Sequence, residues 1–118
     1  MASKNIATAV LRTLMQHVPT RSKLHHARYH DMRASTECIE IFVSSLPPSI
    51  QFLALPENPL RDPCAHMLAR VLPTKTPKLS YLDFKGNYSG QVQFSVAAKE
   101  KLQKAMPHCK IVYTDADG

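Results

Sequence analysis

Two segments in the middle of the chain share one alternation of apolar and polar positions. The first runs from Ile50 to Leu60 and the second from Leu79 to Ser89, and both read L-x-x-L-x-L-x-x-N with other apolar residues allowed for leucine. Because side chains of a strand alternate between its two faces, the fourth and sixth positions of each segment share a face. The pattern therefore predicts two short strands that bury Leu53 and Leu55, or Leu82 and Phe84.

A helical period follows each predicted strand. Apolar residues recur there at spacings of three and four, which is typical of a helix with one buried face. These residues are Ala65, Leu68, Val71 and Leu72 after the first strand, and Val96, Ala97, Leu102, Ala105 and Met106 after the second. Since proline cannot continue a helix, we expect the two helices to end at Leu72-Pro73 and Met106-Pro107.

Weaker copies of the same unit lie on both sides. A shift of 29 residues places a last strand at His108 to Thr114, and a shift of 26 places a first one near Leu24 to Tyr29. Helices are expected over about Lys4 to Val18 and over Glu37 to Leu46, each again followed by proline. The predicted order is α-β-α-β-α-β-α-β with parallel strands, because a helix separates each strand from the next.

Asn58 and Asn87 stand at the same place in the two best copies, 29 residues apart. The chain must turn sharply after each strand, and the turn leaves backbone groups without partners. A buried asparagine side chain can bond such groups. We therefore predict that both asparagines are structural residues of the repeat.

From Leu24 to Thr114 the chain resembles the leucine-rich repeats of the ribonuclease-inhibitor type. Two units match that motif well and two are degenerate. The resemblance implies an α/β fold, a short solenoid of about 3.5 βα units with a curved parallel sheet and helices on the convex side. It also implies a protein-binding role without chemistry of its own. The alternative is an ordinary α/β domain whose strands happen to share a pattern.

In such a solenoid, strand positions that miss the core project from the concave face and form columns across neighbouring strands. Phe52 and Tyr81 would lie side by side there, which suits an interface anchor, or else a pair that stabilises adjacent strands. The third positions are His26, Phe52, Tyr81 and Lys110; the fifth are Arg28, Ala54, Asp83 and Val112; the seventh are His30, Pro56, Lys85 and Thr114. The predicted partner-binding residues are His26, Arg28, Phe52, Tyr81, Asp83 and Lys110.

Charge is unevenly distributed along the chain. The net charge is +6, and no Asp or Glu occurs before Asp31. An acid-free basic amphipathic N-terminus is typical of mitochondrial import sequences. We expect residues 1–23 to form a basic amphipathic helix, a retained import sequence or an N-terminal cap, and residues 24–118 to form the leucine-rich-repeat domain. The expected location is the mitochondrial matrix side, with the cytoplasm as the alternative.

Several chemistries find little support in the sequence. Cys38, Cys64 and Cys109 form no CxxC pair, which indicates buried thiols in a reducing compartment. His26 and His30 are four residues apart, a spacing that could bind zinc on a helix. On the strand expected here, the two side chains would lie well apart. With only three glycines there is no glycine-rich phosphate loop. We predict no enzyme activity, no metal and no cofactor.

The end of the repeat bears on the partner. The last strand would leave an open edge, since only Asp115 to Gly118 follow it, too few to form a polar cap. We therefore expect an accessory subunit or scaffold in a larger hetero-oligomeric complex, at most peripheral to a membrane because no run approaches the ~18 apolar residues of a spanning helix. The alternative is an RNA- or ribosome-associated protein that uses the basic, aromatic concave face.

Overall fold

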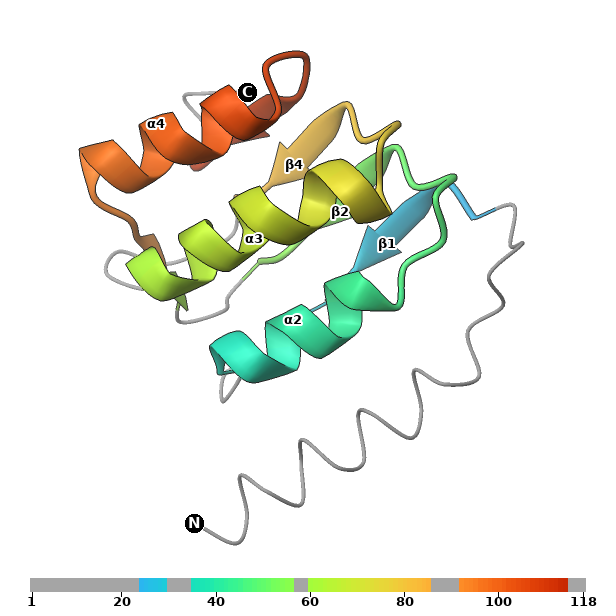
Figure 1. Ribbon diagram of the computed structural model, residues 1–118, viewed down its shortest axis with the longest axis horizontal. Helices are drawn as coiled ribbons and strands as arrows, with labels where there is room; N and C mark the ends of the chain where they lie inside the picture. The colour runs from blue at the N-terminus through green and yellow to red at the C-terminus, as the bar shows by residue number, and fades with distance from the viewer. Residues whose placement is uncertain (1–23, 30–34, 57–59, 86–91, 115–118) are drawn as a thin grey trace, which may run out of the picture.

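A parallel sheet with helices on one face forms the body of the protein (Figure 1). The structure is a computed structural model that describes residues 24–29, 35–56, 60–85 and 92–114. Its four-stranded sheet has the order β1-β2-β4-β6, and a second parallel sheet of two strands pairs β3 with β5. The strands are β1 (His26–Arg28), β2 (Phe52–Ala54), β3 (Leu60–Arg61), β4 (Tyr81–Asp83), β5 (Val92–Gln93) and β6 (Lys110–Val112). The helices are α2 (Thr36–Ser44), α3 (Asp62–Lys75) and α4 (Val96–Ala105).

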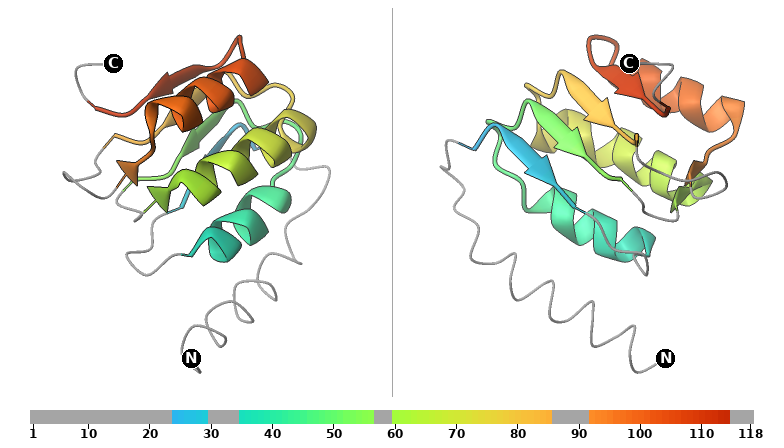
Figure 2. Two further views of the ribbon diagram at one scale, coloured as in Figure 1. Left: turned by 60° about the vertical axis from the view of Figure 1, so that its left-hand side comes forward. Right: turned by 180° about the vertical axis from the view of Figure 1, so that it is seen from behind.

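Alternation of strand and helix winds the chain into a solenoid. Figure 2 shows α2, α3 and α4 stacked side by side on one face of the four-stranded sheet, while the other face carries no described helix. Equal repeat positions pair across the sheet, with His26 opposite Phe52, Phe52 opposite Tyr81, and Tyr81 opposite Lys110. The α/β solenoid, the parallel strands and the register predicted from the repeat are therefore confirmed.

The core lies between the sheet and the helices. The inward strand positions are completely buried, because every second side chain of a strand faces the helices. Complete burial of one leucine contributes about 1.5 to 3 kcal/mol. The fully buried side chains of this layer include Leu53, Leu55, Leu82 and Phe84 from the strand segments, and Ile39, Val43, Leu68, Leu72 and Leu102 from the helices.

Serine side chains start two of the helices. Ser35 Oγ accepts a hydrogen bond from the Cys38 amide at 3.2 Å, and Ser95 Oγ accepts one from the Ala98 amide at 3.1 Å. Both serines have extended backbone, as N-cap residues do. The Ser95 amide itself donates to Asp62 Oδ1 at 2.7 Å. Asp62 is the first residue of α3, so this bond ties the starts of α3 and α4 together.

The predicted end of α3 at Leu72 is wrong. The helix continues through Pro73 to Lys75, so this proline, which lacks an N–H donor, is accommodated in the last turn of the helix. The turn is closed by Thr76, whose amide and hydroxyl donate to the Leu72 carbonyl at 2.8 and 3.0 Å. The predicted end of α4 holds, since Met106 is its C-cap residue.

The predicted apolar face of α4 is partly wrong. Val96 and Ala97 are exposed, Val96 to 73%, whereas Ala98 and Leu102 are buried. Ala98 and Leu102 are one turn apart and therefore share the inner face of the helix. The strands β3 and β5 were also not predicted, since a strand of two residues is too short to show an alternation of apolar and polar positions.

Some predicted features lie outside the described residues. These are the helix over Lys4 to Val18, His30, Asn58, Asn87 and the end from Asp115 to Gly118. The structural role of the two asparagines and the boundary between 1–23 and 24–118 therefore stay predictions. Among the described helices, none combines the length and the apolar character that crossing a membrane requires.

Candidate protein-binding face

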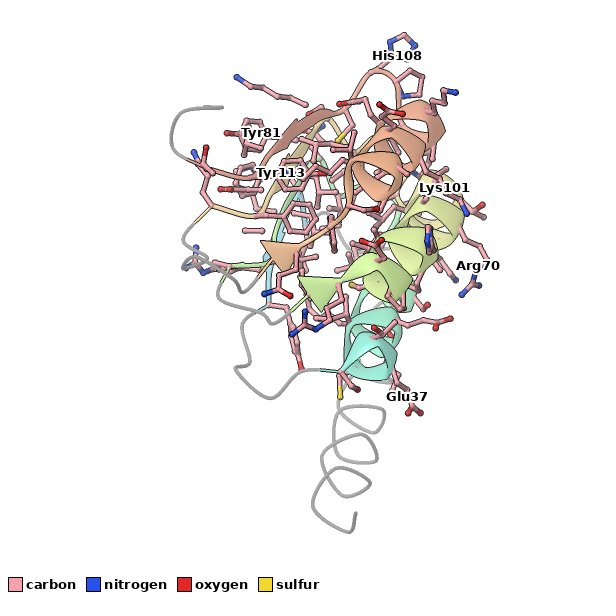
Figure 3. All side chains as sticks on the ribbon, turned by 90° about the vertical axis from the view of Figure 1, so that its left-hand side faces the viewer. Glu37, Arg70, Tyr81, Lys101, His108 and Tyr113 are labelled. Atoms are coloured by element: carbon pink, nitrogen blue, oxygen red, sulfur yellow. The ribbon has the colours of Figure 1, made fainter. Side chains whose placement is uncertain are left out.

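One side chain from each strand of the large sheet forms a row across its helix-free face. We call His26, Phe52, Tyr81 and Lys110 the aromatic column. The ring centroids of His26 and Phe52 are 5.4 Å apart, and those of Phe52 and Tyr81 are 5.0 Å apart at an interplanar angle of 13°. Lys110 Nζ lies 6.0 Å from the Tyr81 ring centroid. Figure 3 shows Tyr81 on one side of the sheet and Arg70 and Lys101 on the opposite, helical side.

The stacking determines which parts of the rings can meet a partner. Phe52 and Tyr81 are partly exposed, and their nearly parallel rings turn their faces toward each other. Such a pair contributes about 0.5 to 1.5 kcal/mol beyond its buried area. The two interpretations of the pair are therefore compatible, because the rings stabilise adjacent strands through their faces and leave their edges for an interface.

Charged groups flank the aromatic column. Asp83 Oδ1 accepts a hydrogen bond from the Lys85 amide at 2.7 Å, which fixes the carboxylate at the end of β4. Lys85 Nζ donates to the Tyr81 hydroxyl at 3.4 Å and lies 5.8 Å from the centre of that ring. Arg28, at the edge of the sheet, is exposed. Two lysines thus lie near the Tyr81 ring, and a carboxylate lies at the end of the same strand.

Two members of the predicted fifth-position column do not reach the surface. Ala54 is 2% exposed and Val112 is fully buried, although both are placed opposite Asp83 as the register predicts. Ala54 is short and lies between Arg28 and Asp83 in the row. The six predicted partner-binding residues all belong to strands of the large sheet, at positions that pair across it, and whether they bind a partner stays a prediction.

The three cysteines are free and buried, as expected from their spacing. Burial raises the pKa of the Cys64 thiol to about 12 and that of Cys109 to about 11. Both thiols are therefore protonated near neutral pH, and a protonated thiol is a poor nucleophile. Within the described ranges, no three His, Cys, Asp or Glu residues gather in a way that could hold a metal ion.

A hollow on the helical side is a feature that the sequence did not predict. It has a volume of about 720 Å³ and is open to solvent. Its lining comes from three helices and comprises Thr36, Glu40, Pro63, His66, Met67, Ala69, Arg70, Lys101, Lys104 and Ala105. The sequence does contain one signal for it, the spacing of Lys101 and Lys104, which lie three residues apart on the polar face of one helix.

Comparison with known proteins supports the fold. A scan against protein-family models gave no match, and neither did a search among curated protein sequences. The structure is similar to the solved C-terminal domain of tropomodulin from Caenorhabditis elegans, with a TM-score of 0.60 and 17% sequence identity. The similarity covers 91% of this chain and 62% of the tropomodulin chain, so the present chain spans about three fifths of its length. That domain is a leucine-rich-repeat domain of the ribonuclease-inhibitor-like type, and the present chain has the same fold.

Proposed function

Because the chain folds as a short leucine-rich-repeat solenoid, we propose that it is a non-catalytic module that binds another protein through the aromatic column. The observation that carries the proposal is a row of stacked, partly exposed side chains across four parallel strands. Aromatic residues dominate the binding energy of many interfaces. Rings already held by their neighbours lose little side-chain freedom when a partner arrives, which lowers the entropic cost of binding.

The stacking favours a protein partner over single-stranded RNA. Nucleic-acid bases bind such surfaces by stacking on free ring faces. Here His26 and Tyr81 lie on the two sides of Phe52, and Lys110 follows Tyr81 in the next strand. With 5.0 Å between the Phe52 and Tyr81 centroids, no base fits between them. Ring edges and the mixed charges of Arg28, Asp83 and Lys110 suit apolar and charged side chains of a protein.

The proposed setting is an accessory subunit of a larger hetero-oligomeric complex on the matrix side of mitochondria. The acid-free basic segment before Asp31 supports this location. The last described strand is consistent with a fixed neighbour, because β6 is an edge strand of the described sheet, and Ile111 within it and Tyr113 directly after it are only partly buried. An edge of this kind offers backbone groups and apolar area to a further subunit.

Co-purification with a variant of the column tests the proposed function. Three tagged forms of the protein would be isolated from its own cells. They are the wild type, the double variant Phe52→Ser with Tyr81→Ser, and the single variant His26→Glu. We expect both column variants to lose a protein that the wild type retains. Val96→Ser is the matched control, since it removes an exposed apolar side chain far from the column. Circular dichroism would establish that each variant is folded.

Three results would contradict parts of the proposal. Retention of every partner by the His26→Glu variant and the folded double variant would remove the column from the interface. Loss of binding between low and moderate salt together with recovery of RNA would favour the nucleic-acid alternative, since phosphate contacts weaken steeply with salt. Absence of the protein from purified mitochondria would overturn the matrix location. Mass spectrometry of the mature N-terminus then decides whether residues 1–23 are retained.

A further inference from the structure

The hollow on the helical side combines an apolar part with charged walls. Met67 lines it although only 4% of this side chain is exposed, so Met67 forms its deeper part. Pro63, Ala69 and Ala105 add further apolar surface. A volume of about 720 Å³ accommodates several side chains of a partner.

The wall formed by α4 is strongly basic. Lys101 and Lys104 lie three residues apart, so they stand on neighbouring turns of the same helix face, and both are exposed. Among the residues that the structure describes, neither lysine forms an ion pair. Two ammonium groups thus face the hollow with their charge uncompensated by described groups.

The opposite wall differs in charge. Glu40 of α2 accepts a hydrogen bond and forms an ion pair with Arg70 of α3 at 3.2 Å. This pair offsets one positive charge and places a carboxylate across the hollow from the two lysines. The charge of the lining is therefore positive in sum and polarised from one wall to the other.

We propose that this hollow binds an acidic segment of a second protein partner, with its carboxylates on Lys101 and Lys104 and an apolar side chain against Met67. The site lies on the opposite side of the sheet from the aromatic column, so the two contacts do not compete (Figure 3). The protein would then link two partners, one on each face. This inference is independent of the proposed role of the aromatic column.

Charge and shape select this occupant. A nucleic acid carries negative charge along its whole length, which Glu40 would meet on one wall, and it has no aliphatic side chain to place against Met67. A flat membrane surface would meet the exposed lysines but would leave Met67, which is only 4% exposed, without a contact. The chain's own N-terminal segment is unsuited, because it has no carboxylate before Asp31 and carries several Lys and Arg residues. A peptide can supply carboxylates and an apolar side chain together.

Selection from a random peptide library displayed on phage tests the inference with the full chain as bait. We expect the selected peptides to be enriched in Asp and Glu next to aliphatic residues. When these peptides are added, the changes in the backbone amide chemical shifts of the protein should concentrate in residues 63–70 and 101–105. The variant Lys101→Glu with Lys104→Glu should weaken binding by about tenfold or more, since like charges then meet across the contact.

Controls make the outcome decisive. Lys75→Glu with Lys78→Glu changes the net charge equally at exposed lysines outside the hollow, and should leave the affinity unchanged. Phe52→Ser with Tyr81→Ser should also leave it unchanged, which separates this site from the aromatic column. Lys101→Ala with Lys104→Ala provides a milder variant should the charge reversal fail to fold.

The inference is overturned if the peptides show no acidic enrichment, or if their binding survives loss of both hollow lysines. Equal weakening in the Lys75 and Lys78 control would also overturn it, because the binding would then follow net charge alone. Single-stranded RNA and vesicles of phosphatidylcholine with phosphatidylserine serve as competing probes. Should either one bind through Lys101 and Lys104 while acidic peptides do not, the occupant is a different polyanion.

Discussion

The helices α3 and α4 belong to the two copies that match the repeat best, and yet they are buried to very different extents. α3 has six buried residues, whereas α4 has two, Ala98 and Leu102. α3 lies between α2 and α4, while α4 has a described helix on one side only (Figure 2). In a solenoid each unit completes its core with its neighbours. Position in the stack therefore determines burial as much as the motif does.

The largest expected effect comes from truncating one core leucine in each helix. Leu68 and Leu102 are both fully buried. We expect Leu68→Ala to lower the free energy of unfolding by about 4 kcal/mol and Leu102→Ala by about 2.5 kcal/mol, because α4 can shift into the cavity from the open side. Denaturant unfolding measures both values. An equal or larger cost at Leu102 would show that α4 is held as firmly as α3.

Alkaline pH should separate the same two regions. The pKa of Cys64 in α3 is raised to about 12 and that of Cys109 after α4 to about 11, from an ordinary value of 9.0. Below pH 9 both thiols are protonated in folded and unfolded chains. Above it the unfolded chain loses these protons first, so stability falls as the pH rises from 9 toward the folded pKa of each thiol.

Comparison of single cysteine variants isolates these contributions from other groups that titrate in the same range. Relative to the wild type, Cys109→Ala should remove a loss of stability that levels off near pH 11. Cys64→Ala should remove a loss of stability that continues to about pH 12. Equilibrium unfolding at a series of pH values measures this. Parallel pH curves for the wild type and Cys64→Ala would mean that the Cys64 thiol is accessible to solvent.

The smallest expected effect concerns the start of α4. Ser95→Ala removes the hydroxyl oxygen that accepts a hydrogen bond from the Ala98 amide. This change should lower the free energy of unfolding by about 1 kcal/mol. We expect faster hydrogen exchange at the Ala98 amide with little change in α3, because the end of a helix can open locally. Ser35→Ala in α2 is the matched control at the other helix with a serine cap. Faster exchange throughout α3 in the Ser95 variant would mean that both helices open together.

The sequence predicts the structure accurately where an element repeats. A 29-residue shift placed Phe52, Tyr81 and Lys110 in one row, and the strand pairing agrees. It failed where a boundary depends on neighbours, as at Pro73, which α3 incorporates, and at Val96, which faces solvent. Helix ends and helix orientation are set by cap bonds and by packing, and a periodic pattern carries neither.

The two candidate sites differ in the same way. The aromatic column follows from the alternation of strand side chains, so its members could be identified from the sequence. The close stacking of the Phe52 and Tyr81 rings, at an angle of 13°, could not be predicted from the sequence. The hollow on the helical side was missed altogether, because its lining spans Thr36 to Ala105 and no local pattern unites those residues.

By itself, then, the sequence determined the repeat, the alternation of strand and helix and the register of the parallel sheet, because these follow from local periodicity and from the fixed length of the unit. Only the tertiary structure decided how deeply each unit is buried, how the rings stack and which lysines line a common hollow. Those properties depend on side chains brought together from different units. Their distances are set by packing between units, which the order of residues within one unit does not contain.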